Sequence, residues 1–541
     1  MATGNHEPRT TDKLIWILLT IAVIFIYFFG LSIPLLGPDE ARYAQVAREM
    51  FERGEWITPT LGGFHWFEKP ALLYWLQIAS YKIFGVTEFA ARFGSALFGL
   101  GTIFCLWILG KFSAAKSAEK TGENAKTEVQ RPETDFANWL ALIAASSIGL
   151  LAFSRGASFD IILTFPITAS LVSFFIWETS RAPRYNGTHG KNNFSKNFAR
   201  PATLISFYFF IGVALLAKGL VGIIFPLATV ALYYLLSFKL PGRAFFFSLF
   251  WGTTLCLLVA SVWYLPMYQA HGWTFIDEFF LQHHFQRYTS NKYQHPQPFW
   301  FFWFVLPLMT IPWLPFFLAS IRNPVRNIFY RKNAAAAAEE NQKLSAQRSA
   351  LNTFAFAWLL VPVVFFSLSG SKLPGYVLPV LPAALILTAD YVARFVRKSK
   401  RRAIVLQVAA FLMFAVVFVI LQFFIDAYPQ RETVKNLIVT ANSQGFGDAK
   451  ILMLHTISHN AEFYGAGRLV RRPDGKQRYL YGVAEVREFI EQNGNEPVLV
   501  LVPLEYLNDL TASDLVSSKI LADNGELAIA AATARETMNA E

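Results

Sequence analysis

One stretch near the start of the chain passes from apolar to charged residues: LIWILLTIAVIFIYFFGLSIPLLGPDEAR, residues 14–42. Its first part is almost wholly apolar and is long enough to cross the roughly 30 Å hydrocarbon layer of a bilayer as a helix. It then gives way to Asp39, Glu40 and Arg42. The run is too long and too bulky for a cleaved signal peptide, and no small-residue cleavage site precedes the charges. We therefore predict a retained membrane anchor.

Similar apolar runs recur along the 541 residues, which have a mean hydropathy of +0.36 and are 16% aromatic. This composition indicates an α-helical polytopic membrane protein. Eleven spans are expected, near residues 14–36, 91–110, 136–153, 159–178, 202–217, 219–238, 244–268, 299–320, 351–369, 375–393 and 403–425. The two cysteines, Cys105 and Cys256, both fall inside such spans, so no disulfide framework is implied.

The net charge of +11 is distributed unevenly. Lysine and arginine cluster in alternate loops, at residues 116–131, 181–200, 322–332 and 394–402. The positive-inside rule makes these loops cytoplasmic, so the charge reflects membrane topology and not nucleic-acid binding. The other loops, 37–90, 154–158, 269–298 and 370–374, then lie on the opposite side, which in a bacterium is the periplasmic face of the inner membrane.

This alternation requires that residues 70–85, PALLYWLQIASYKIFG, do not cross the membrane. The segment is short, contains Gln77 and Lys82, and is rich in aromatic residues that favour the headgroup region. An interfacial helix is therefore expected. If it crossed, the positive charges of every later loop would face the wrong side.

After residue 427 the apolar runs become short and β-rich, as in AKILMLHTI (449–457) and EPVLVLVPL (496–504), with a helical pattern at 483–494 between them. This predicts a small soluble α/β domain. The expected organisation is a cytoplasmic N-terminus (1–13), a transmembrane domain (14–426) whose first periplasmic loop is 37–90, and a periplasmic C-terminal domain (427–541).

The stretch GPDEARYAQVAREMFERGEW, residues 37–56, predicts an amphipathic helix that begins at Pro38 and ends before Gly54. Its later charges, Glu49, Glu52 and Arg53, are expected to face water. The earlier three, Asp39, Glu40 and Arg42, are candidates for a site, because carboxylates in a first helical turn are stabilised by the free N–H groups there.

Further charges occur at the same membrane level. In GGFHWFEKP (62–70), Glu68 and Lys69 precede a proline that favours extended backbone, so their side chains are expected to point in different directions; a simple ion pair is the alternative. Asp160, Lys218 and Lys372 lie at the ends of predicted spans. Ionisable groups at such positions usually mark a site, although isolated lysines also reach the interface from apolar surroundings.

The loop at 271–300 contributes His283, His284, Arg287 and His295. Adjacent helical histidines point about 100° apart, so His283 and His284 are not expected to share one ion. Histidine is a common zinc ligand, so one of them is a candidate to bind a metal ion together with a distant carboxylate. The alternative is a packed or hydrogen-bonded histidine without a ligand. His455 and His459 are given no role.

Several motifs in order resemble one known family. They are PDEARYAQVAREM, FEKP, ASFD, AKG, HHFQRY and SKLPGYVLP, between about residues 14 and 394. The set is similar to the lipid A 4-amino-4-deoxy-L-arabinose transferases, GT-C glycosyltransferases related to the protein O-mannosyltransferases. One departure is the count of eleven spans, where family members that modify lipid A commonly have thirteen, and it bears on the identity of the acceptor.

The resemblance implies a cavity at the periplasmic surface, in which a sugar passes from undecaprenyl phosphate to lipid A phosphate or another lipopolysaccharide acceptor. It implies catalytic roles for Asp39 and Asp160. It implies a zinc-type metal ion on Glu68 and His284, and a monomer among membrane lipids without nucleic acid. The donor-phosphate contacts that it implies are Arg42, Tyr43, Lys69, Lys218, Arg287, Lys372 and Tyr376.

The residue types suit this chemistry. Negative charge develops on a phosphate leaving group, and arginine and lysine stabilise it. Asp39 would act as a general base for a hydroxyl acceptor, or would stabilise positive charge on the sugar ring if the acceptor is a phosphate. Two alternatives stay open: a related transferase that moves galacturonic acid, hexosamine or mannose to a core sugar or protein, and a polytopic transporter. Against the transporter, the charges gather at one membrane surface and no inverted repeat is visible.

Overall fold

The computed structural model describes residues 10–120, 133–180, 200–289, 296–322, 339–424 and 433–535. The chain divides into two compact units. The first consists of Met1–Phe29, Glu68–Leu73 and Ser95–Phe418. The second consists of Gly30–Phe67, Tyr74–Gly94 and Val419–Glu541.

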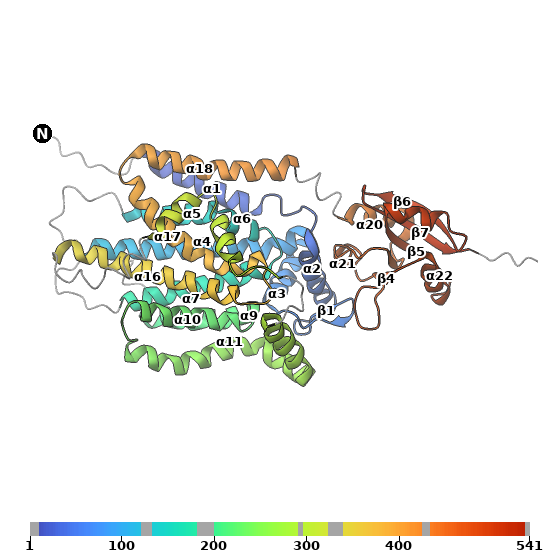
Figure 1. The fold of residues 1–541 in the computed structure, drawn as a ribbon, viewed down its shortest axis with the longest axis horizontal. Coiled ribbons are helices and arrows are strands. Elements are labelled where there is room, and N and C mark those ends of the chain that lie inside the picture. Colours follow the sequence, from blue (N-terminus) through green and yellow to red (C-terminus); the bar gives the residue numbers. More distant parts are fainter. Residues whose placement is uncertain are drawn as a thin grey trace, which may run out of the picture. The chain divides into compact units, whose positions relative to one another are not determined.

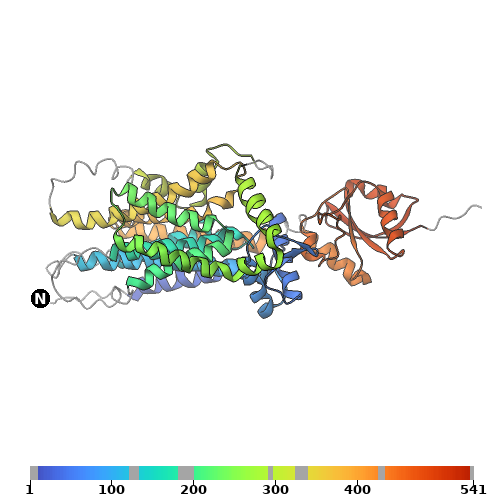
Figure 2. The ribbon, with the colours of Figure 1, turned by 90° about the horizontal axis from the view of Figure 1, so that it is seen from below.

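The first unit is a bundle of helices that run alongside one another (Figure 1, Figure 2). Its α-helices are α1 (Thr10–Phe28), α4 (Glu88–Lys120, whose first turns belong to the second unit), α5 (Glu133–Ser146), α6 (Ile148–Phe153), α7 (Phe159–Ser180), α9 (Arg200–Lys218), α10 (Val221–Leu236), α11 (Arg243–Ile276), α12 (Arg287–Thr289), α13 (Phe301–Met309), α14 (Leu314–Ser320), α16 (Glu339–Ser367), α17 (Leu381–Val396) and α18 (Lys400–Val419). The other helical segments of this unit are the π-helix η1 (Asp277–Gln286) and the 3-10 helix η3 (Pro374–Val380), and the π-helix η4 (Ile420–Phe424), which follows α18, belongs to the second unit. Helices are expected here because a backbone in lipid must satisfy its own hydrogen bonds.

Each of the eleven predicted spans contains helix. Within the described ranges, seven helices are long and apolar enough to cross a membrane, and three shorter apolar helices fall at 14–28, 136–146 and 221–236. The remaining span, 299–320, is broken into α13 and α14. The prediction of a polytopic helical membrane protein is therefore confirmed.

Aromatic side chains form much of the core of this bundle. Phe174 of α7 is fully buried, and its ring lies within 6.4 Å, centroid to centroid, of six other rings. These rings belong to Trp177, Phe207, Tyr233, Tyr234, Phe245 and Phe354. Edge-to-face and stacked rings of this kind join α7 to α9, α10, α11 and α16, which accounts for part of the aromatic excess.

In the second unit, the predicted amphipathic helix is α2 (Gly37–Glu52), with Pro38 in its first turn. Gly54 has φ +66°, a conformation that glycine adopts at little cost just after a helix end. The short strands β1 (Thr60–Leu61) and β2 (Phe64–His65) follow as an antiparallel hairpin.

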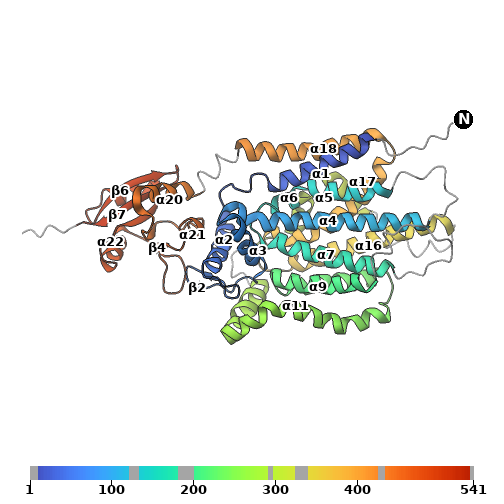
Figure 3. The same ribbon diagram turned by 180° about the vertical axis from the view of Figure 1, so that it is seen from behind.

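Residues 70–85 form α3 (Leu72–Phe84), most of which lies in the second unit. Thirteen residues rise only about 20 Å, too short to span a bilayer, as the prediction of an interfacial helix requires. Figure 3 shows α3 beside α2, and the Tyr81 hydroxyl donates to the Ala44 carbonyl at 3.1 Å.

The C-terminal part of the second unit has the predicted α/β fold. Its elements are α20 (Lys435–Ala441), η5 (Asn442–Phe446), β3 (Ile451–Leu454), α21 (Ala461–Tyr464), β4 (Tyr479–Leu480), α22 (Val483–Gln492), β5 (Val498–Pro503), η6 (Leu504–Tyr506), α23 (Leu507–Thr511), β6 (Val516–Asp523) and β7 (Leu527–Ala534). The sheet has the strand order β4-β3-β5-β7-β6, in which β3 is parallel to β4 and β5 while β7 is antiparallel to β5 and β6. A hydrophobic cluster covers each face of the sheet.

The first loop and the C-terminal domain, which are separated by more than 300 residues in the sequence, belong to the same compact unit. No local pattern in the sequence predicts this association. It follows from side-chain contacts that α21 and α20 make with α2 and with the start of α4.

Candidate active site

The N-terminal turn of α2 places two of the predicted residues together. The Asp39 carboxylate forms an ion pair with the Arg42 guanidinium one turn later. Arg42 also donates to the Pro38 carbonyl at 3.1 Å and lies 5.8 Å from the centre of the Trp66 ring. The Asp39 side chain keeps 52% of its surface exposed, so a carboxylate and a cation stand together at a solvent-accessible helix start.

Glu40, the third candidate of this stretch, has a structural role. Its carboxylate accepts from both the Nε and the Nη2 of Arg92 at 2.9 and 2.7 Å, and from the Leu36 amide at 2.8 Å. Arg92 is 1% exposed and also donates to three backbone carbonyls, those of Leu31, Ile33 and Pro34. Sequence reasoning missed Arg92, whose signal was an arginine at the start of an apolar helix.

The expectation that Glu49 faces water is wrong. Its carboxylate accepts from the Thr60 hydroxyl at 2.7 Å and from the Gly62 amide at 2.6 Å. It therefore holds the β1–β2 hairpin against α2, a contact between segments that the helical pattern does not reveal. Glu52 and Arg53 are exposed, as expected. Tyr43 is buried at 6% exposure.

Glu68 and Lys69 do not point in different directions. The Lys69 ammonium donates to the Glu68 carboxylate at 2.6 Å, and the two side chains are only 13% and 11% exposed. The chain turns at residues 67–69 and is not extended as expected, and the long, flexible lysine stem lets the ammonium reach the preceding residue. The alternative of an ion pair is the one found, and the pair is largely buried.

A second charged pair joins three separate segments of the first unit. Asp160, in the first turn of α7, forms an ion pair with Lys218, the last residue of α9. The Lys218 ammonium also lies 4.8 Å from the centre of the Tyr376 ring of η3. Both charged side chains are more than four-fifths buried. A carboxylate, a cation and an aromatic ring therefore converge where the helices end.

The tight approach of η3 to this pair depends on one glycine. A Cβ added at Gly375 would overlap the Asp160 carboxylate. Close by in the chain, Lys372 is 7% exposed, and its ammonium donates to the Ser369 carbonyl at 2.7 Å. Lys372 is thus a buried cation with a backbone acceptor.

For two of the predicted site residues the structure describes only the backbone. The backbones of His284 and Arg287 fall in η1 and α12, but their side chains are outside the described part of the structure, as is all of His295. Across the residues that are described, no group of three histidine, cysteine, aspartate or glutamate side chains lies close enough to hold a metal ion.

Several titratable groups in the C-terminal domain have shifted pKa values, among them His459 and Glu462. Partial desolvation lowers the pKa of His459, a residue that keeps much of its surface exposed, and the nearby Arg42 lowers it further, while Asp39 opposes both. Burial raises the pKa of Glu462 against the opposing effect of Arg471. His459 was given no role in the sequence analysis, but its pKa is affected by the charges of Asp39 and Arg42 at the start of α2.

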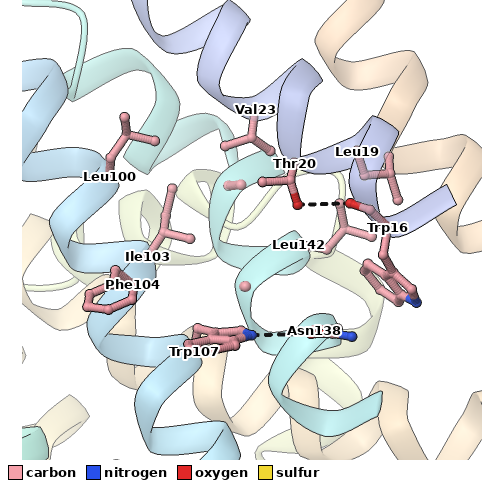
Figure 4. A pocket seen from close by; sticks show the side chains of 12 residues that line it. Trp16, Leu19, Thr20, Val23, Leu100, Ile103, Phe104, Trp107, Asn138 and Leu142 are labelled. Carbon is pink, nitrogen blue, oxygen red and sulfur yellow. Dashed lines mark hydrogen bonds between the residues drawn. The ribbon is translucent and has the colours of Figure 1, made fainter. Parts of the chain in front are cut away.

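An apolar pocket of about 430 Å³ lies between α1, α4 and α5, away from these charges (Figure 4). The indole N–H of Trp107 donates to Asn138 at 3.2 Å, and the Thr20 hydroxyl donates to the Trp16 carbonyl at 2.8 Å. None of the predicted site residues lines this pocket.

The sequence is similar to a mannosyltransferase family near its start and to aminoarabinose transferases over most of its length. Residues 15–118 match the family of dolichyl-phosphate-mannose-protein mannosyltransferases. Over 394 residues, 71% of the chain, it is 29% identical to the undecaprenyl phosphate-alpha-4-amino-4-deoxy-L-arabinose arabinosyl transferase of Shewanella sediminis, of which it covers 61%. Over 463 residues it is 27% identical to the enzyme of that name from Yersinia enterocolitica, with coverage of 83% of this chain and 72% of the relative.

Solved structures agree on the fold. ArnT from Cupriavidus metallidurans, bound to undecaprenyl phosphate, matches with a TM-score of 0.72 at 20% identity over 96% of this chain and 98% of that one. The Archaeoglobus fulgidus oligosaccharyltransferase matches with a TM-score of 0.52 at 12% identity over 95% of this chain and 73% of that one. The resemblance in the sequence is therefore confirmed as a similarity: the chain is similar in sequence to the aminoarabinose transferases and, over residues 15–118, to the protein mannosyltransferases, and it has the GT-C membrane fold of ArnT.

Proposed function

We propose that this protein is a glycosyltransferase that moves a sugar from undecaprenyl phosphate to lipid A phosphate or another lipopolysaccharide acceptor. The sugar proposed is 4-amino-4-deoxy-L-arabinose, the one in the names of its relatives. The reaction would take place at the periplasmic face of the inner membrane. The chain covers only 61% of the length of the Shewanella relative, so the reaction is put forward here as a proposal.

The observation that carries the proposal is the convergence of Asp160, Lys218 and Tyr376. Burying a carboxylate and an ammonium costs several kcal/mol per ion, so an apolar bundle has little reason to keep them unless they act on a polar ligand. A phosphate that ends a polyprenyl chain needs a cation at the end of a membrane bundle. Lys218 provides that cation, with Asp160 holding it in place.

The charges suit cleavage of a sugar–phosphate bond. As the bond breaks, negative charge builds on the phosphate, and cations that are already in place stabilise it without reorganising. We assign this role to Lys69, Lys218 and Lys372, with Arg42 as a bidentate phosphate ligand. The assignments of Tyr43, Arg287 and Tyr376 to the donor stay predictions.

Asp39 is proposed as the catalytic carboxylate. It is accessible to solvent and is paired with the Arg42 guanidinium. A hydroxyl acceptor would give its proton to Asp39, whereas a phosphate acceptor would leave Asp39 to stabilise the sugar cation. Direct displacement inverts the anomeric centre, and product stereochemistry checks this.

The metal ion remains a separate proposal. Glu68, one of the two predicted ligands, has its carboxylate engaged by Lys69. The described residues therefore do not by themselves fit a metal, and no step above uses one. Metal analysis of the purified protein, with Glu68→Gln beside the unchanged chain, tests whether zinc is present.

A radiolabelled transfer assay tests the function. Purified protein in lipid is incubated with undecaprenyl-phosphate aminoarabinose and lipid A, and labelled lipid A is expected. Lys218→Ala should lower the rate at least about 100-fold, since it removes a cation from the developing charge. Lys239→Ala, an exposed lysine after α10, is the matched control and should keep the full rate.

One finding favours a second candidate. Residues 15–118 match a mannosyltransferase family, so the donor sugar could be a hexose such as mannose. Mass spectrometry of lipid A from cells with and without the gene distinguishes the two. A mass increment of a hexose, or no change in lipid A at all, would contradict the aminoarabinose proposal.

A further inference from the structure

The segment before α2 carries Asp39 into position, and its backbone is held from several sides. Arg92 binds three of its carbonyls, and Glu40 accepts the Leu36 amide at 2.8 Å. Neither Arg92 nor Glu40 binds the amide of the neighbouring Leu35, and Leu35 is fully buried. A buried amide needs a partner, because an unsatisfied one costs about 1–3 kcal/mol.

That partner comes from the C-terminal domain. The Leu35 N–H donates to the Tyr464 hydroxyl oxygen at 2.9 Å, although the two residues are 429 positions apart. The Tyr464 hydroxyl in turn donates to the Glu88 carboxylate at 3.2 Å. Lys435 also reaches Glu88, with its ammonium at 2.5 Å from the same carboxylate oxygen.

Glu88 ties this contact to the Arg92 cluster. The two residues are one turn apart at the start of α4, and Glu88 is 8% exposed. Burial, and the Glu88 carboxylate, raise the pKa of the Tyr464 hydroxyl, so it stays protonated and can donate at physiological pH. The network is therefore a fixed chain of charge-assisted and neutral hydrogen bonds that ends on the segment before Asp39.

The same short helix meets α2 at a second point. The Arg48 guanidinium, two turns after Asp39, donates to the Phe463 carbonyl at 3.4 Å. Thus α21 contacts both the body of α2 and the segment that leads into it. Two contacts of this kind fix the position and the direction of the helix that begins at the catalytic carboxylate.

We propose that Tyr464 is a positioning residue for Asp39: the C-terminal domain holds the start of α2 in its catalytic position through the Tyr464 hydroxyl. The proposal rests on the proposed transferase function for Asp39. It assigns a role to a domain that otherwise has none, and it predicts that the domain acts on turnover and not on donor binding.

The test combines hydrogen exchange with kinetics on the full-length protein in lipid. Tyr464→Phe keeps the ring and removes only the hydroxyl. Exchange of peptides covering residues 31–40 should become about five- to tenfold faster, which corresponds to one lost hydrogen bond. In the transfer assay, kcat should fall about tenfold while KM for the donor stays within about twofold, because a misplaced group slows chemistry more than binding.

Tyr481→Phe is the matched control, since this tyrosine of the same domain is 76% exposed; neither measurement should change. If Tyr464→Phe does not fold, Glu88→Gln, which weakens the acceptor of the same hydroxyl, is expected to give the same pattern. Unchanged exchange at 31–40 overturns the network, and faster exchange with an unchanged kcat overturns the positioning role. The exchange measurement needs no activity, so it distinguishes failure of this proposal from failure of the proposed function.

Discussion

At the scale of single residues, Lys69 gives the sharpest test of the phosphate-binding role. Its side chain is 11% exposed, and its ammonium is 2.6 Å from Glu68. Lys69→Ala should abolish transfer, since no other cation in this motif can replace it, and should lower the free energy of unfolding by about 1–3 kcal/mol by removing the ammonium that pairs with the largely buried Glu68 carboxylate. Transfer kinetics and thermal unfolding of the purified variant measure the two effects.

The double variant Glu68→Gln/Lys69→Ala is the control for this pair. The double variant removes the buried carboxylate charge together with the ammonium that pairs with it, so stability should return towards that of the unchanged protein while transfer stays absent. If transfer returned together with stability, Lys69 would be a structural residue and not a ligand of the phosphate.

At the scale of helices and strands, the sequence predicts the elements well and their contacts poorly. Apolar periodicity and length were enough for the eleven helical segments, and Pro38 with Gly54 gave the bounds of α2. The pairing of Asp160 with Lys218 depends on how α7 packs against α9, which no local pattern contains. For the same reason Arg92 and Tyr464 were missed, because each acts on a segment distant in the sequence.

Gly375 tests how tightly η3 packs on the charged pair of α7 and α9. A methyl group there would overlap the Asp160 carboxylate, which is held by Lys218 and cannot easily move aside. Gly375→Ala should therefore lower the free energy of unfolding by about 1–3 kcal/mol and slow transfer as the pair is displaced. Thermal unfolding and the transfer assay measure both. Gly447→Ala, where a Cβ meets nothing within 4 Å, should change neither; equal effects in the two variants would show that packing at Asp160 is not the cause.

At the scale of the whole molecule, the second unit should lose stability in mild acid through His459. Its pKa in the folded protein is lowered by partial desolvation and by Arg42, so the unfolded chain binds the proton more readily; because the residue is exposed, the loss of stability should be small. As pH falls through the ordinary histidine value of about 6.5 towards the lowered one, protonation then favours unfolding. Thermal unfolding between pH 7 and pH 5 should show this decline, and His459→Gln should reduce it; a decline of the same size in the variant would assign it to other groups.

The membrane topology of the whole chain depends on whether α3 crosses the bilayer. Chemical labelling of two positions that are expected on opposite sides of the membrane can decide this. In a variant without Cys105 and Cys256, Lys239→Cys follows α10 and Tyr481→Cys lies exposed in the C-terminal domain. If α3 lies at the interface, the positive loops are cytoplasmic, and a membrane-impermeant maleimide added from the periplasmic side should label residue 481 and not residue 239. If α3 crosses, every later loop changes sides and the labelling is reversed. The reversed result would place the Asp160–Lys218 pair at the cytoplasmic face, where a donor sugar presented in the periplasm cannot reach it.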